Sequence, residues 1–119
     1  MKLERVHHAS LCVSDLARAK VFYGKVLGLE EIPRPDFPFA GAWYRAGGNE
    51  LHLIVLDEGT APDTPLNALH RHVAFAVQDV GGASAELEAR GYAVLGGGPG
   101  SAQAWVRDDD GNIIELIRP

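Results

Sequence analysis

The sequence predicts an α+β domain made of two tandem βαβββ modules. The first observation is an internal repeat, because residues 8–15 read HASLCVSD and residues 72–79 read HVAFAVQD. The second is a match between residues 47–54, GGNELHLI, and residues 110–117, DGNIIELI. The third is a pair of short segments that share an Ala-Trp-x-Arg pattern, residues 42–45 and 104–107. Three matches in the same order indicate a duplicated module.

The first half gives the order of elements in one module. Residues 5–13 alternate in polarity and suit a strand. Ser14-Asp15 is typical of a helix N-cap, and the apolar residues that follow recur at helical spacing up to Gly28, which favours the end of the helix. Glycine, proline and aromatic residues then mark out three further short strands near residues 29–33, 41–46 and 50–56.

The second half repeats this order. It has a strand at 71–77, a helix capped by Asp79 and ended by Gly91, and three short strands near 92–95, 102–107 and 112–118. A polar, proline-bearing segment separates the halves. We therefore expect a single domain over residues 1–119, whose parts are module one (about 1–57), a linker (about 58–66) and module two (about 67–119).

Composition excludes several classes of protein. The formal net charge of the 119 residues is −5, and acidic and basic residues are interspersed without a basic stripe. Clustered Lys and Arg would be needed at a nucleic-acid or anionic membrane surface, so neither partner is expected. The single cysteine, Cys12, cannot form an intrachain disulfide, which favours a cytoplasmic protein.

Two repeated positions carry residues that bind metals. In a strand alternate side chains share a face, so His8 lies on the face of small residues and so does its repeat partner His72. His52 and Glu115 share one repeat position in the last strand of each module. If an approximate two-fold relates the modules, these two pairs meet at one axis. We therefore predict one divalent metal ion bound by His8, His52, His72 and Glu115.

Each of these residues has a structural alternative. A lone histidine on a strand is most often hydrogen-bonded and partly buried, and His52 could support a ligand instead of being one. Glu115 lies in the apolar run Ile113–Ile117. A buried carboxylate must be paired or bound to metal, and no cation lies within this strand. Imidazole and carboxylate together suit Zn, Ni, Co, Fe or Mn, so the identity of the metal stays open.

Other residues are weaker candidates. The glycine-rich run at residues 96–100 lacks the Lys-Ser/Thr of a phosphate-binding loop and is expected to be a flexible loop. The two tryptophans are interpreted as repeat core, with a substrate platform as the alternative. The expected substrate contacts are Tyr44, Arg45 and Arg107.

Four segments carry a resemblance to a known family: HHASLCVSDLARAKVFYGKVLGLEEI, GNELHLI, RHVAFAVQD and RDDDGNIIELI. Together they resemble the vicinal oxygen chelate superfamily, which includes glyoxalase I, extradiol dioxygenases, fosfomycin-resistance enzymes and bleomycin-binding proteins. The resemblance implies paired βαβββ modules, a metal in a cupped mixed sheet, and chelation of a small substrate through two adjacent oxygens. It also implies a homodimer and the ligands His8, His52, His72 and Glu115.

One position departs from the family. Bacterial-type glyoxalase I carries a glutamate where this chain has His52, so the proton shuttle of that enzyme is in doubt. The set His8, His72 and Glu115 resembles a two-histidine, one-carboxylate triad. A divalent ion held by one carboxylate keeps a formal charge of +1 and would favour an anionic bidentate ligand.

Three functions follow from these features. The first is a metal-dependent enzyme of the glyoxalase type, a lyase or isomerase in which Glu115 is ligand and base. The second is an extradiol-type dioxygenase. The third is a non-catalytic binding or resistance protein of the bleomycin-binding type, although such binders lack the ligand set. The sequence leaves open the substrate, the use of glutathione or another thiol, and whether modules pair within or between chains.

Overall fold

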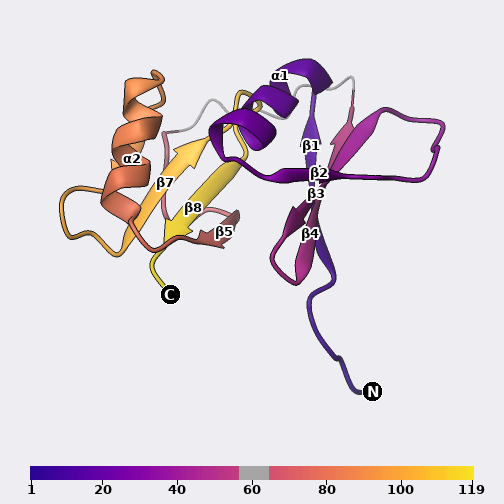
Figure 1. The fold of residues 1–119 in the computed structure, drawn as a ribbon, viewed down its shortest axis with the longest axis horizontal. Coiled ribbons are helices and arrows are strands. Elements are labelled where there is room, and N and C mark those ends of the chain that lie inside the picture. The colour runs from indigo at the N-terminus through magenta and orange to yellow at the C-terminus, as the bar shows by residue number, and fades with distance from the viewer. Residues whose placement is uncertain (57–64) are drawn as a thin grey trace. The chain divides into compact units, whose positions relative to one another are not determined.

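The computed structural model describes residues 1–56 and 65–119, and Figure 1 shows its elements in chain order. The chain divides into two compact units, Met1–Thr60 and Ala61–Pro119. The segment expected to link the modules lies largely outside the described residues. None of the helices in the described ranges is both long enough and apolar enough to cross a membrane.

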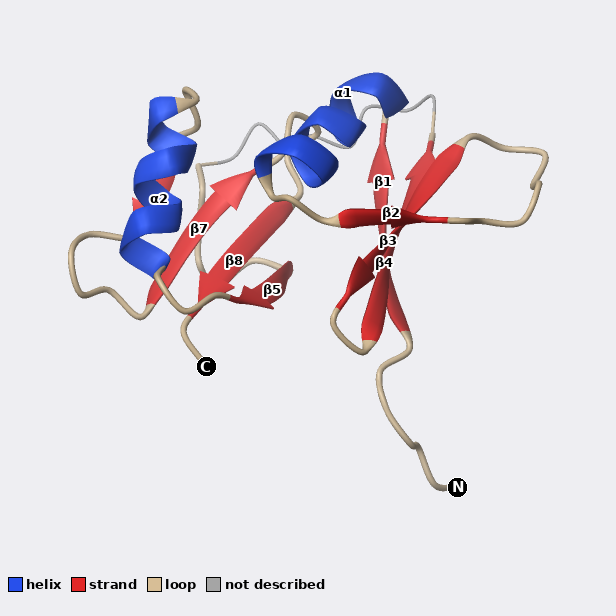
Figure 2. Ribbon diagram, viewed as in Figure 1, coloured by secondary structure: helices blue, strands red, loops and turns tan. Residues whose placement is uncertain are grey.

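Each unit is a βαβββ module, as the secondary-structure colouring of Figure 2 shows. The first has the sheet order β1-β4-β3-β2 and the second β5-β8-β7-β6, and in each the first strand runs parallel to the last. The α+β class and the paired modules are therefore confirmed. The strands of the first unit are β1 (His8–Val13), β2 (Glu30–Ile32), β3 (Gly41–Ala46) and β4 (Asn49–Val55). Those of the second are β5 (His72–Ala76), β6 (Val94–Gly96), β7 (Gln103–Arg107) and β8 (Ile113–Ile117).

Each helix begins at an aspartate cap and is followed by a glycine with positive φ. The Asp15 carboxylate accepts a hydrogen bond from the backbone N–H of Arg18 at 2.9 Å, and this cap starts α1 (Leu16–Lys20). The first helix then widens into the π-helical turns of η1 (Val21–Val26), which sequence periodicity did not predict. In the second unit the Asp79 carboxylate caps α2 (Val80–Ala89) in the same way. Gly28 and Gly91 follow the helices with φ of 74° and 91°, a conformation that favours glycine.

The core of each unit lies between its sheet and its helix. Strand alternation sends Leu51 and Leu53 to the helix side, together with Tyr44, which pairs with Leu51 across β3 and β4. These residues are each about 1% exposed, Phe22 and Tyr23 of η1 are fully buried, and the rings of Tyr23 and Tyr44 have centroids 6.4 Å apart. In the second unit the corresponding buried residues are Val80, Leu87, Ala104, Val106, Ile114 and Leu116. The opposite face of each sheet carries the predicted ligands.

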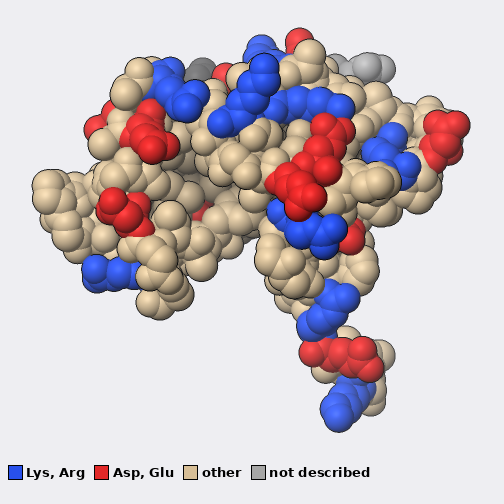
Figure 3. Space-filling model, in the orientation of Figure 1, with Lys and Arg blue, Asp and Glu red and all other residues tan. Residues whose placement is uncertain are grey.

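Charged side chains of both signs lie next to one another on the face drawn in Figure 3. Two exposed ion pairs, Lys20–Glu31 at 2.7 Å and Arg45–Glu30 at 3.3 Å, belong to the first unit. Exposed pairs of this kind contribute at most about 1 kcal/mol to stability. The mixture of signs agrees with the interspersed charges of the sequence.

Candidate metal centre

In the second unit His72 and Glu115 lie in contact. β5 and β8 run parallel, and Glu115 lies opposite Ala74, two residues beyond His72 on the same face. The Nε2 atom of His72 lies 2.9 Å from Oε2 of Glu115, whose side chain is only 7% exposed. Two ligands on one metal ion at about 2.1 Å are separated by about 3 Å when they subtend a right angle. The observed separation therefore suits neighbouring positions around one ion.

Neighbouring groups orient both side chains. The Nδ1 atom of His72 lies 2.7 Å from the carbonyl oxygen of His70, and because a carbonyl only accepts, Nδ1 carries the hydrogen. In the neutral ring the lone pair is then on Nε2, which faces Glu115. Gln103 donates from Nε2 to Oε1 of Glu115 at 2.7 Å and leaves Oε2 toward His72. Two electron-pair donors face each other, so they require a proton or a cation between them, and the donor set fits a divalent ion.

In the first unit the two predicted ligands meet differently. The rings of His8 and His52 stack face to face, with centroids 4.1 Å apart and an interplanar angle of 15°. Trp43 covers the other face of His52 at 3.9 Å and 2°. The Nε2 atom of His52 lies 2.7 Å from Oε2 of Glu50. His52, at 7% exposure, is thus held on both faces and at one edge.

Glu50 also contributes to this site, although it is not among the residues predicted from the sequence. It lies two residues before His52 on the same face of β4 and directly opposite His8 on β1. The hydrogen bond from His52 is the main reason why the pKa of Glu50 lies below its usual value. Desolvation raises this pKa, and electrostatic interactions with His52, His7 and His8 lower it further. The signal was present in the sequence, because strand alternation places residues 50 and 52 on one face.

The interpretation of the two tryptophans as core residues is wrong. Trp43 is paired with His52 across β3 and β4, and Trp105 is paired with Glu115 across β7 and β8. Both therefore lie on the ligand face and not on the helix side. The register of the first pair follows from the two-residue turn at Gly47-Gly48, which joins Ala46 to Asn49.

The expected substrate contacts fall on different faces. Tyr44 lies on the helix side, separated by the sheet from His52, and burial, with a smaller contribution from Glu31, raises its pKa to about 12. It is therefore a core residue in this unit. Arg45 shares the ligand face but pairs with Glu30. Arg107 shares the face of Trp105 and donates to the carbonyl oxygen of Pro65 at 2.9 Å.

The four predicted ligands therefore come together two by two. Within residues 1–56 and 65–119 no group of three or more His, Cys, Asp or Glu side chains is arranged to hold a metal ion. The meeting of the two pairs at one ion stays a prediction.

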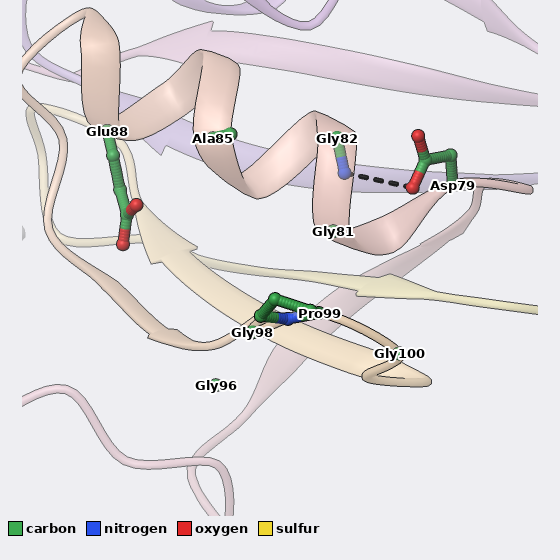
Figure 4. A pocket seen from close by; sticks show the side chains of 10 residues that line it. Asp79, Gly81, Gly82, Ala85, Glu88, Gly96, Gly98, Pro99 and Gly100 are labelled. Carbon is green, nitrogen blue, oxygen red and sulfur yellow. Dashed lines mark hydrogen bonds between the residues drawn. The ribbon is translucent and has the colours of Figure 1, made fainter.

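A separate cavity of about 420 Å³ lies in the second unit between α2 and the loop at residues 96–100 (Figure 4). None of the predicted ligands lines it. Its lining includes Asp79, which is engaged in capping Gly82, and Glu88. Two carboxylates in the lining make an anion site unfavourable, which agrees with the absence of a phosphate-loop motif.

Comparison with known proteins places the chain in a family. Residues 5–116 match the model of the Glyoxalase/Bleomycin resistance protein/Dioxygenase superfamily, so the chain belongs to this superfamily. It is 30% identical to "Glyoxylase I 4" of Arabidopsis thaliana over 98% of this chain and 71% of that protein.

Among solved structures it resembles lactoylglutathione lyase from Agrobacterium tumefaciens, with a TM-score of 0.70, 25% identity and coverage of 97% and 93% of the two chains. It also resembles TnmS3, an antibiotic binding protein from Streptomyces sp. CB03234, with a TM-score of 0.71, 30% identity and coverage of 100% and 98%. The relatives thus include a named lyase and a named binding protein.

Proposed function

We propose that the protein is a divalent-metal-dependent enzyme of the glyoxalase type that binds a small substrate through two adjacent oxygens and transfers a proton. The observation that carries the proposal is the His72–Glu115 pair, in which Nε2 and Oε2 lie 2.9 Å apart. His70 and Gln103 fix the orientation of both ligands. The superfamily match and the lyase relative support an enzyme.

The proposed site combines one pair from each unit. His72 and Glu115 provide one half, and His8 with a second group from β4 provides the other. For that second group the sequence predicts His52. The pairing of units can occur within one chain or between two chains, and we propose a homodimer in solution. Light scattering should give twice the chain mass of 12.8 kDa, whereas a monomer at micromolar concentration would contradict the dimer.

The chemistry divides between the ion and the protein. A divalent ion bound here supplies Lewis-acid polarisation of the substrate oxygens. Gln103 and His70 hold the ligands in place before substrate arrives, which lowers the cost of organising the site. Glu115 is the only carboxylate among the ligands that the sequence predicts, and we assign the transfer of the substrate proton to it. Trp43 and Trp105, on the same faces, provide flat walls for the substrate.

A second candidate is a binding protein without catalysis. The observation that favours it is the 30% identity to an antibiotic binding protein over the whole chain. The two functions differ in their need for metal. A binding protein could take up its ligand through Trp43 and Trp105, which lie on the ligand faces, without an ion.

Calorimetry with two bidentate probes, acetohydroxamate and catechol, tests the proposal. We expect both to bind metal-loaded protein and not the metal-free form, because adjacent oxygens require the ion. Equal binding to both forms would favour the binding protein, and binding to neither would contradict substrate chelation. Oxygen uptake during turnover of catechol by the iron-loaded protein would indicate a dioxygenase and contradict the glyoxalase-type reaction. Anaerobic isomerisation of an oxo-compound would support the glyoxalase-type reaction.

A further inference from the structure

The stacked rings of His8 and His52 are not arranged to share a metal ion. The lone pairs of an imidazole lie in the ring plane, so a bound ion also lies in that plane. The planes of His8 and His52 are nearly parallel, at 15°, with centroids 4.1 Å apart. Planes so arranged intersect far from both rings. No position close to both rings therefore lies in both planes, unlike the edge-to-edge contact of His72 and Glu115.

Reorienting His52 would break several contacts. Its second face is covered by Trp43 at 3.9 Å and 2°, and its side chain is 9% exposed. Stacked aromatic contacts of this kind favour the observed orientation of the ring. Its Nε2 atom is already engaged by Glu50 at 2.7 Å. His72 makes a similar contact with Glu115, but its side chain is 29% exposed, whereas His52 at 9% has little room to turn away from Glu50.

Glu50 is placed to bind a metal ion together with His8, whereas His52 is not. It projects from the same face of β4 and stands directly opposite His8 on β1. Its side chain is 30% exposed, so it is less constrained than His52. The contact with His52 occupies Oε2, and a carboxylate has a second oxygen to offer. Carboxylates that bind metals are themselves commonly held by a hydrogen-bond donor, and His52 is placed to be that donor.

We propose that Glu50, and not His52, is the metal ligand from β4. His52 positions the Glu50 carboxylate through a hydrogen bond donated by its Nε2–H. The inference rests on the proposed function, because it assigns a ligand within the same site. The ligand set becomes His8, Glu50, His72 and Glu115. With two carboxylates a divalent ion is formally neutral, which replaces the charge of +1 expected when His52 is the ligand.

Two matched substitutions separate the roles. Glu50→Gln keeps the size of the side chain but removes the carboxylate, and His52→Gln keeps an N–H donor but removes the imidazole. Zinc affinity is measured by competition with a chromophoric chelator for both variants, for the wild type and for His72→Gln. Circular dichroism of the metal-free proteins verifies folding. We expect Glu50→Gln to weaken zinc binding by more than 100-fold and His52→Gln by less than 10-fold.

The nitrogen resonances of His52 provide a readout that does not depend on substitution. In zinc-loaded wild type we expect Nε2 of His52 to keep its proton, seen as a one-bond N–H coupling, while a nitrogen of His72 shows the shift of a metal-bound atom. Loss of the Nε2 proton on zinc binding, or a larger affinity loss for His52→Gln than for Glu50→Gln, would overturn the inference.

The remaining outcomes separate the inference from the proposed function. If neither β4 variant changes affinity while His72→Gln does, Glu50 is not a ligand but the metal site stands. If the wild type binds no zinc, or His72→Gln binds it as tightly as the wild type, the proposed function itself fails and the inference with it.

Discussion

Gln103 is expected to control metal affinity without touching the metal. Its Nε2 donates to Oε1 of Glu115 at 2.7 Å and so leaves Oε2 pointing at His72. Gln103→Leu keeps the approximate volume of the side chain and removes this donor. The carboxylate then loses a charge-assisted hydrogen bond worth about 1.5–3 kcal/mol and gains freedom to rotate. Both effects weaken the binding of a cation at Oε2.

The expected loss is about 10- to 100-fold in metal affinity, the usual range for groups that orient a ligand. This corresponds to about 1.4–2.7 kcal/mol, which agrees with the strength of the hydrogen bond. Chelator competition with zinc at fixed pH measures it. Gln78→Leu is the matched control, because Gln78 is exposed and follows β5. Wild-type affinity in Gln103→Leu, or an equal loss in Gln78→Leu, would refute the reasoning.

Two further predictions concern stability. The buried Tyr44 hydroxyl has no hydrogen-bond partner among the described residues, so Tyr44→Phe should leave the free energy of unfolding unchanged or raise it by up to about 2 kcal/mol, as measured in urea. The pKa of Tyr44 is raised from 10.0 to about 12, so its contribution to stability is complete below pH 10 and is lost as the pH rises toward 12; this alkaline slope should shrink in Tyr44→Phe. A side chain at Gly41 would collide with the carbonyl oxygen of Leu53, whereas one at Gly48 meets nothing within 4 Å. Gly41→Ala should therefore cost about 1–3 kcal/mol and Gly48→Ala less than about 1 kcal/mol, and equal costs would contradict this.

Local signals were sufficient to predict the order of strands and helices and the ends of the helices. The aspartates at residues 15 and 79 cap their helices, and the glycines at 28 and 91 follow them with positive φ. These features depend on neighbouring residues only, so the sequence contains them. The π-helical turns of η1 were not predicted, because the spacing of apolar residues does not distinguish them from α-helix.

Strand alternation placed the predicted ligands on the correct faces, but it could not define their contacts. Whether two side chains on one face meet edge to edge, as His72 and Glu115 do, depends on strand register and on rotamers. The contact between the Glu50 carboxylate and the edge of the His52 ring likewise depends on strand register and rotamers. The sequence predicts Trp43 as repeat core, with a substrate platform as the alternative. The turn at Gly47-Gly48 fixes its register opposite His52 and gives the correct face.

The metal content of the purified protein tests the central claim most directly. Protein prepared without chelator should contain about one divalent ion per chain, because each chain supplies one pair of modules. His72→Ala and Glu115→Ala should lose the ion, since each removes one of two facing donors that lie 2.9 Å apart. Elemental analysis of the wild type and both variants, with folding verified by circular dichroism, gives the answer. Full occupancy in both variants, or wild type without metal after incubation with zinc, nickel, cobalt, iron and manganese, would contradict the account.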